Sequence, residues 1–366
     1  MTVMASTARQ SGATQPDDAG RLGFGTRFTD HMVTIRWTSA GGWQDPELID
    51  YQHLALDPAA VGLHYGQIVF EGLKAYRQQD GGVALFRPEH NARRINRSSQ
   101  RLVIPELPER AFLAALHALV AADHAQVPSA RGQSLYLRPF IIAVEPTLGV
   151  RPAQEYLFVL IASPVGSFFS GGLSPVSVWV SDTFVRAAPG GTGAVKYPGN
   201  YAAGFLAQRE AAEQGCEQVV WLDAVERRWI EEMGAMNLFF VADGEDGGPT
   251  RLLTPRLTGT LLPGVVRDSL LTLAADDGYD VREERLPIEF WQSGWEDGSL
   301  REVFASGTAA VVTPVEAMRR GEREWKAPTG TGNPVTLALR ERLLDIQYGV
   351  TEDVHGWRSP VVLPGV

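Results

Sequence analysis

Short runs of alternating apolar and polar residues in the first half of the chain predict β-strands. β-Branched and aromatic residues recur at every second position of these runs, as expected for strands with one buried face. The predicted strands are 32–37, 83–86, 134–144 and 156–162. Two helical patterns lie between them, at 88–102 and 108–125, and the second carries its apolar residues along one stripe.

The second half of the chain again mixes strands and helices. Strands are predicted at 176–181, 218–223, 236–241 and 301–305, and helices at 201–214, after Gly264, and at 334–348. A glycine-rich loop at 187–200 leads into the first of these helices. Because both halves contain both kinds of element, the pattern predicts a mixed α/β or α+β fold with two domains.

Changes in composition mark the expected domain boundaries. Residues 1–20 are polar and lack an apolar core, so we expect a disordered tail and no secretory signal. The Gly/Ser/Pro-rich stretch 166–176 predicts a linker between a small α/β domain at 21–165 and a larger domain at 177–366. A length of 366 residues with 44% apolar residues is typical of a globular protein with two such domains.

Charge and residue usage exclude several classes of function. The net charge of −10 argues against a nucleic acid as the main partner, because a phosphate backbone needs a basic surface. No run approaches the roughly eighteen apolar residues that a membrane helix requires. The single cysteine, Cys216, cannot form an internal disulfide and favours a reducing, cytoplasmic setting. The seven histidines show no metal-ligand spacing, so no metal is expected.

Lysine is scarce, and its positions are candidates for a reactive amine. Only three of the 33 lysine and arginine residues are lysines. A Schiff base needs an amine that can lose its proton, which arginine does not provide. Codon bias explains the scarcity equally well, so context must decide. Lys326 lies in a charged stretch and Lys74 in an amphipathic run where it would face solvent. Lys196 lies in the flexible glycine-rich loop before a helix and is the best candidate.

The glycine-rich loop around Lys196 is not a nucleotide-binding motif. It has neither the spacing of a dinucleotide fingerprint nor a Gly-Lys-Ser/Thr ending. The chain also lacks a Gly-x-Ser-x-Gly nucleophile elbow. Nucleotide-binding and serine-hydrolase functions are therefore not supported.

Six separated motifs occur in an order that is typical of one enzyme family. They are YGQIVFEGLKAY at 65–76, YLRP at 136–139, KYPGNY at 196–201, EEMGAMNLF at 231–239, LPGV at 262–265 and SGTA at 306–309. Together they closely resemble the branched-chain aminotransferases of the fold-type IV pyridoxal-phosphate enzymes. The resemblance implies a two-domain fold-type IV structure with the active site between the domains and pyridoxal 5'-phosphate as cofactor.

The same resemblance assigns cofactor-binding residues. Lys196 would form the Schiff base and move the proton between substrate and cofactor. Glu232 would face the pyridine nitrogen, and Tyr201 would hydrogen-bond the phenolic oxygen. The cofactor phosphate would be bound by Arg93, Gly264, Val265, Val266 and Thr308. Without the resemblance, Glu231 and Glu232 are most simply a solvent-facing pair, and the arginines next to Arg93 are equally good candidates for surface charge.

The substrate-binding residues also follow from the resemblance. An apolar pocket for branched side chains would be formed by Phe24, Tyr65, Phe70 and Tyr136. The carboxylate end of the substrate would be recognised by Arg138, Gly307, Thr308 and Ala309. Without the motifs, each aromatic residue is more simply a core residue.

The implied reaction is the transamination of leucine, isoleucine and valine with 2-oxoglutarate, which gives branched-chain 2-oxo acids and glutamate in two half-reactions. The resemblance further implies a homodimer in which the partner chain contributes to each pocket. Two alternatives stay open. Another fold-type IV enzyme, a D-amino-acid aminotransferase or an aminodeoxychorismate lyase, would share the roles of Lys196 and Glu232. A non-catalytic carrier or regulator would bind the cofactor without needing an acid at the ring nitrogen.

Overall fold

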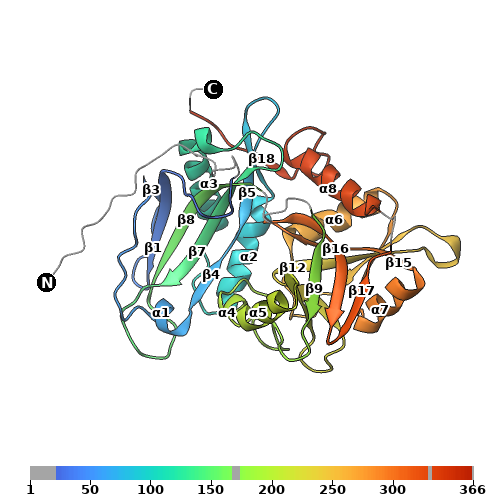
Figure 1. Ribbon diagram of the computed structural model, residues 1–366. Helices are drawn as coiled ribbons and strands as arrows, with labels where there is room; N and C mark the ends of the chain where they lie inside the picture. Colours follow the sequence, from blue (N-terminus) through green and yellow to red (C-terminus); the bar gives the residue numbers. More distant parts are fainter. Residues whose placement is uncertain (1–21, 167–173, 329–331, 365–366) are drawn as a thin grey trace.

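The computed structural model describes residues 22–166, 174–328 and 332–364, which form two nine-stranded sheets with helices packed against them (Figure 1). The first sheet has the order β18-β6-β5-β7-β8-β1-β2, with β3 paired to β1 and β4 to β7. Its strands are β1 (His31–Thr38), β2 (Gly42–Trp43), β3 (Glu47–Asp50), β4 (Ile68–Phe70), β5 (Leu73–Arg77), β6 (Val83–Phe86), β7 (Ser134–Ala143), β8 (Glu155–Val165) and β18 (Arg358–Pro360).

Antiparallel pairing and two long helices give the first sheet its core. The helices of this part are α1 (Val61–Tyr65), α2 (Pro88–Arg101) and α3 (Glu109–Ala122). Alternate residues of β1, Val33 and Ile35, are fully buried, as the alternating pattern predicts. Phe112 of α3 meets Phe158 of β8 edge to face, with ring centroids 6.1 Å apart. The apolar stripe of α3 therefore covers this face of the sheet.

The second sheet combines parallel and antiparallel pairs in the order β11-β10-β9-β16-β15-β12-β13-β14. Its strands are β9 (Val176–Val180), β10 (Gln218–Leu222), β11 (Ile230–Met233), β12 (Met236–Ala242), β13 (Arg251–Pro255), β14 (Asp280–Glu284), β15 (Leu300–Gly307), β16 (Val311–Arg320) and β17 (Arg323–Lys326). Since β11 also pairs with β12, the hydrogen bonding closes into a ring from β11 through β16 and back. Strand β11 therefore has a neighbour on both sides.

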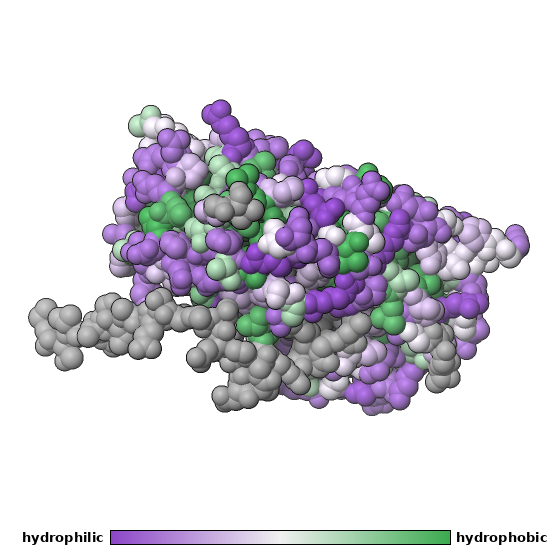
Figure 2. Space-filling model, turned by 90° about the horizontal axis from the view of Figure 1, so that it is seen from above, coloured by the Kyte–Doolittle hydropathy of each residue, from purple (hydrophilic) through white to green (hydrophobic). Residues whose placement is uncertain are grey.

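Five helices accompany the second sheet in the described part of the chain. They are α4 (Gly199–Ala202), α5 (Phe205–Glu213), α6 (Val265–Asp276), α7 (Ile288–Asp297) and α8 (Pro334–Gln347). None of the described helices is long and apolar enough to cross a membrane. On the face seen in Figure 2, hydrophobic residues form small patches among mainly hydrophilic ones.

The mixed α/β prediction is confirmed, and most predicted elements occur within a few residues of their expected bounds. The helix expected at 201–214 is wrong in one respect: it is divided into α4 and α5 around Gly204, where glycine weakens a helix. The expected tail at 1–20 lies outside the described residues, as do residues 167–173 of the expected linker. The chain end returns to the first sheet, because β18 pairs with β6.

Candidate functional site

A cavity of about 270 Å³ lies where the two sheets meet. The first part of the chain contributes Phe24, Phe70, Gly72, Arg94, Tyr136 and Arg138 to its wall. The second part contributes Lys196, Tyr201, Gln218, Ala235, Met236, Asn237, Leu262, residues 264–267 and residues 306–310. Residues separated by more than 200 positions therefore share one site.

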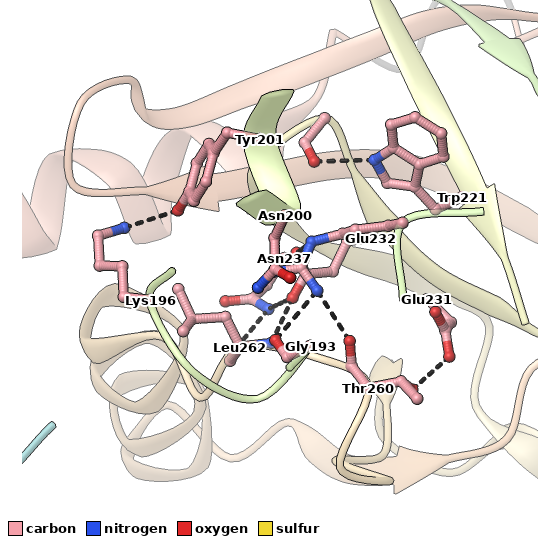
Figure 3. Close-up of polar contacts among 12 residues, drawn as sticks. Gly193, Lys196, Asn200, Tyr201, Trp221, Glu231, Glu232, Asn237, Thr260 and Leu262 are labelled. Carbon is pink, nitrogen blue, oxygen red and sulfur yellow. Dashed lines mark hydrogen bonds and ion pairs between the residues drawn. The ribbon is translucent and has the colours of Figure 1, made fainter. Parts of the chain in front are cut away.

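Lys196 lines this cavity. Its backbone N–H donates to Ser98 Oγ of α2 at 3.0 Å, and its carbonyl accepts from the N–H of Phe70 at 3.1 Å. The side-chain Nζ donates to the phenolic oxygen of Tyr201 at 3.0 Å (Figure 3). Two contacts with the first sheet and its helices thus hold the backbone while the amine faces Tyr201. This is an arrangement in which the amine can exchange a proton with the neighbouring hydroxyl.

Tyr201 is positioned by the short helix α4. Its ring packs at a tilt against Phe70 of β4, with centroids 5.0 Å apart. The loop before α4 is fixed by Asn200, whose Nδ2 donates to the carbonyls of Thr192 at 2.7 Å and Val195 at 3.1 Å. The glycine-rich loop is therefore tied back onto itself, and the spacing between Lys196 and Tyr201 is defined by local structure.

Glu232 is a buried carboxylate, 2% exposed, at the back of the cavity. Its Oε1 accepts from the N–H of Leu262 at 2.5 Å (Figure 3). Its Oε2 lies 3.0 Å from Nε of Arg186. Burial raises the pKa of Glu232, and the charge of Arg186 opposes this shift. Glu232 does not itself border the cavity. It contacts Leu262, which does.

Arg186 is a functional candidate that the sequence did not reveal. It is buried beside Glu232, and its Nη1 donates to the carbonyls of Gly193 at 3.1 Å and Thr260 at 2.8 Å. The guanidinium thus joins the glycine-rich loop to the segment that carries Leu262. No local motif surrounds Arg186 in the sequence, so only the folded arrangement identifies it.

Arg94 reaches the cavity, whereas Arg93, the arginine expected from the sequence, does not. The Arg93 side chain is 53% exposed and lies 3.7 Å from Glu109 of α3. Arg94 is 4% exposed, and its Nη1 donates to the carbonyl of Pro263 at 3.0 Å. Successive helical residues point about 100° apart, so one position decides which arginine faces the site. Arg94, and not Arg93, therefore lines the cavity.

The start of α6 provides an anion site opposite Arg94. Gly264 is its N-cap, and Gly264, Val265 and Val266 all line the cavity. The first N–H groups of a helix have no partner within the helix and attract anions. A Cβ at Gly264 would collide with the side-chain oxygen of Asn237, so a larger residue does not fit here. Thr308 adds a hydroxyl to the same cavity.

Most of the expected substrate residues lie around the cavity. Phe24 packs edge to face on Tyr136 with centroids 4.9 Å apart, and Phe70 lines the same wall. Arg138 donates to the Tyr136 hydroxyl at 2.9 Å and lies 5.0 Å above the Phe70 ring. Residues 307–309 form the opposite side. This side of the cavity therefore consists of aromatic rings, and the guanidinium of Arg138 lies among them.

Tyr65 is not part of this cavity. Its side chain lies on the surface, 43% exposed, and its hydroxyl donates to the carbonyl of Leu148 at 2.6 Å. Leu148 is also exposed, as are Leu63 and Val150. The expected role of Tyr65 as a pocket residue therefore does not hold within one chain, and these four residues form an exposed apolar patch.

The other two lysines, Lys326 and Lys74, differ in their exposure to solvent. Lys326 is exposed, as its charged surroundings predict, and its Nζ lies 3.2 Å from Glu324. Lys74, expected to face solvent, is buried instead, and its Nζ donates to the carbonyl of Ala309 at 3.0 Å. Burial lowers the pKa of Lys74 to about 7. Lys74 thus supports the 307–309 segment from behind and does not reach the cavity.

The chain is similar to proteins of one family. Residues 68–318 match the family described as Amino-transferase class IV. Over 98% of this chain and 97% of the relative, it is 54% identical to the branched-chain-amino-acid aminotransferase of Mycolicibacterium smegmatis. The branched-chain amino acid aminotransferase of Escherichia coli superposes with a TM-score of 0.74 at 28% identity, covering 90% of this chain and 99% of that one. The T.th. branched-chain amino acid aminotransferase complexed with N-(5'-phosphopyridoxyl)-L-glutamate gives 0.69 at 28% identity, covering 90% and 98%.

Proposed function

Because the chain belongs to the branched-chain-amino-acid aminotransferases of the class IV amino-transferase family, we propose that it exchanges an amino group between leucine, isoleucine or valine and 2-oxoglutarate. The observation that carries this proposal is the pairing of Lys196 with Tyr201 inside a cavity walled by aromatic residues. The amine provides the reactive group, and the apolar wall suits a branched side chain.

The proposed cofactor is pyridoxal 5'-phosphate. When bound, it supplies a carbonyl that reacts with amines and a ring that accepts electrons from the substrate. Lys196 would hold it covalently, Tyr201 would hydrogen-bond its phenolic oxygen, and Glu232 would face its ring nitrogen. Its phosphate would be bound by Arg94 and by the N–H groups at the start of α6, both of which line the cavity. The phosphopyridoxyl compound in the T.th. relative supports this assignment.

Lys196 would move the proton during each half-reaction. Its Nζ would accept the proton from the substrate Cα and then donate a proton to the cofactor. In the second half-reaction the two transfers would run in the opposite direction. Tyr201 lies 3.0 Å away and would orient this amine. The Phe70 ring, 4.9 Å from Nζ, keeps one side of the amine apolar and so excludes water from it.

Two kinds of substrate must use the same aromatic wall. The rings of Phe24, Phe70 and Tyr136 would accept the side chain of leucine, isoleucine or valine. Arg138 is set among these rings and would bind the side-chain carboxylate of glutamate or 2-oxoglutarate. The backbone of residues 307–309 would bind the carboxylate that both substrates share.

We propose that the active form is a homodimer. The exposed patch of Leu63, Tyr65, Leu148 and Val150 carries residues that a single chain leaves in water. Tyr65 would then border the cavity of the partner chain, which reconciles its expected role with its position on the surface. A monomeric mass in size-exclusion chromatography with light scattering would contradict this proposal.

The proposed activity is tested by incubating the purified protein with 2-oxoglutarate and either L-leucine or D-alanine. Formation of L-glutamate from L-leucine, and not from D-alanine, is the expected result. Glutamate formation from D-alanine would favour a D-amino-acid aminotransferase instead. A protein that binds the cofactor but transfers no amino group from L-leucine in a single turnover would be a carrier or regulator.

A further inference from the structure

The two neighbouring glutamates of β11 serve different cavities. Successive side chains of a strand point to opposite faces, so Glu231 and Glu232 diverge. Figure 3 shows Glu232 near Asn237 and Leu262, and Glu231 next to Thr260. Glu231 borders a second cavity of about 360 Å³, whose wall also includes Trp229, Thr260 and Arg256. This second cavity shares none of its lining residues with the first.

Glu231 borders the second cavity and has one buried carboxylate oxygen without a hydrogen-bond partner among the described residues. The residue is 4% exposed, and its Oε1 accepts from the hydroxyl of Thr260. Its Oε2 is buried and has no hydrogen-bond partner among the described residues. Burial of an unpaired carboxylate oxygen is costly, and burial raises the pKa of Glu231 to about 7. A donor that carries positive charge would satisfy this oxygen and stabilise the ionised form.

The same cavity also borders an unsatisfied donor. The indole Nε1–H of Trp229 is buried and finds no acceptor in the part of the chain that the structure describes. The ring of Trp229 is held by Arg285, whose guanidinium carbon lies 4.2 Å from the ring centroid. Arg256 lies exposed on the cavity wall and forms no ion pair with another described residue. Among the described residues, Glu231 Oε2 thus lacks a donor, the Trp229 indole lacks an acceptor and Arg256 lacks an ion-pair partner. The cavity wall also carries the carboxylates of Asp223, Glu226 and Glu284, which favour a cationic group in the cavity.

We propose that the second cavity binds a free α-amino acid as a zwitterion, with its ammonium group on Glu231 and its carboxylate towards Trp229 and Arg256. An amino acid carries both missing groups, and the volume is sufficient for a small one. A metal ion is a poorer fit, because the described residues contain no cluster of three His, Cys, Asp or Glu side chains that could hold one.

The second cavity is connected to the candidate active site by one short segment. Thr260 donates its hydroxyl to Glu231 and accepts at its carbonyl from Arg186 at 2.8 Å. Two residues on, the N–H of Leu262 donates to Glu232. An amino acid bound at Glu231 would therefore contact the segment that holds the carboxylate of the active site.

The test is thermal unfolding of the wild-type holoenzyme and of Glu231→Gln with glycine, methylammonium or acetate. Glycine supplies both groups, methylammonium only the cation and acetate only the anion. We expect glycine at about ten times its Kd to raise the Tm of the wild type by roughly 1–3 °C, and each partial probe to raise it less. The shift should disappear in Glu231→Gln. Amines can also react with the cofactor at Lys196, so the cofactor absorbance is recorded in both proteins, and only a Tm shift without a change in this absorbance is assigned to the second cavity.

Arg256→Gln provides a second variant that does not disturb the interior, because Arg256 is exposed. In this variant glycine should raise the Tm no more than methylammonium does. The Tm shift caused by methylammonium should be the same as in the wild type. Glu289→Gln, an exposed site on α7, is the control and should respond as the wild type does. No glycine shift in the wild type would mean that water alone fills the cavity. That result, or an equal shift in Glu231→Gln, would overturn the proposal.

Discussion

Arg94 and Glu71 form a buried bidentate ion pair, with Nε to Oε1 and Nη2 to Oε2 both at 2.7 Å. Both side chains are at most 4% exposed. Asn91 also donates to Glu71, at 2.8 Å. This pairing leaves Nη1 of Arg94 directed to Pro263, next to the start of α6. A residue from the first part of the chain is thus fixed in place to face the anion site of the second.

We predict that Arg94→Gln weakens cofactor retention by about tenfold to a hundredfold, since a charge-assisted hydrogen bond contributes about 1.5–3 kcal/mol. It should also lower the free energy of unfolding by about 3–5 kcal/mol, because Glu71 is left buried without its partner. Cofactor titration by absorbance and denaturation in urea measure the two effects. The double variant Glu71→Gln/Arg94→Gln should recover stability but not cofactor affinity.

Arg93→Gln is the matched control for that experiment. Arg93 pairs with Glu109 on the surface, where an ion pair contributes about 1 kcal/mol or less. Retention of the cofactor should therefore match the wild type. Weaker retention in Arg93→Gln, with normal retention in Arg94→Gln, would show that the phosphate binds on the other side of α2.

Lys196→Ala should reduce turnover at least about a hundredfold, because it removes the amine that moves the substrate proton. Borohydride reduction of the wild type, followed by peptide mapping, should find the cofactor joined to position 196. Lys326→Ala serves as the control, since that side chain is 72% exposed and does not line the cavity. A reduced adduct at Lys74 or Lys326 would refute the assignment.

Glu232→Gln should lower the rate of transamination more than it lowers cofactor binding. The amide keeps the acceptor for the N–H of Leu262 but cannot balance a positive charge at the ring nitrogen. Loss of such a preorganised charge costs about a hundredfold in rate. Single-turnover absorbance with L-leucine measures the rate, and cofactor titration measures binding. An unchanged rate would mean that another acid faces the ring.

The stability of the protein should depend on pH through Glu231. The folded protein holds this proton up to about pH 7, whereas an unfolded chain releases it near the ordinary pKa of 4.5. The folded state therefore binds more protons between these values, and this residue's contribution to stability falls as pH rises from 4.5 to 7. Above about pH 7 its contribution is constant.

Glu231→Gln should remove that contribution. Between about pH 5 and pH 8 the variant should lose less stability than the wild type, by about 2–3 kcal/mol, because most of the difference between the ordinary pKa of 4.5 and the folded pKa of about 7 falls in this range. Urea denaturation without added amino acids measures both proteins, and their difference cancels the other titrating groups. Parallel pH profiles for the two proteins would show that Glu231 is ionised in the fold as it is in water.

Motifs and periodicity predicted much of the fold and many of the residues that line the cavity, because they depend on neighbours in the sequence. The alternation in β1 and β7 and the apolar stripe of α3 are local features. Lys196 could be identified because its glycine-rich loop is distinctive. Tyr201 followed because it lies five positions further in the same motif.

The errors concern residues whose environment is set by distant parts of the chain. The choice between Arg93 and Arg94 depends on which side of α2 faces the second sheet. Lys74 is buried because the segment of Ala309, more than 200 residues away, covers it. Tyr65 lies on the surface, where its hydroxyl donates to the carbonyl of Leu148 in a distant part of the chain. The role of Arg186 rests on two carbonyls and one carboxylate that no sequence pattern brings together.

Strand β11 has a consequence for how this protein can change in evolution. It has only four residues, Ile230–Met233, and is hydrogen-bonded to β10 and β12. Inserting or deleting one residue would exchange the faces of its side chains and turn Glu232 away from Arg186. Loops around the strand can vary in length, but the strand itself must be inherited without gaps. Within β11 itself, either cavity can therefore change only by point substitution.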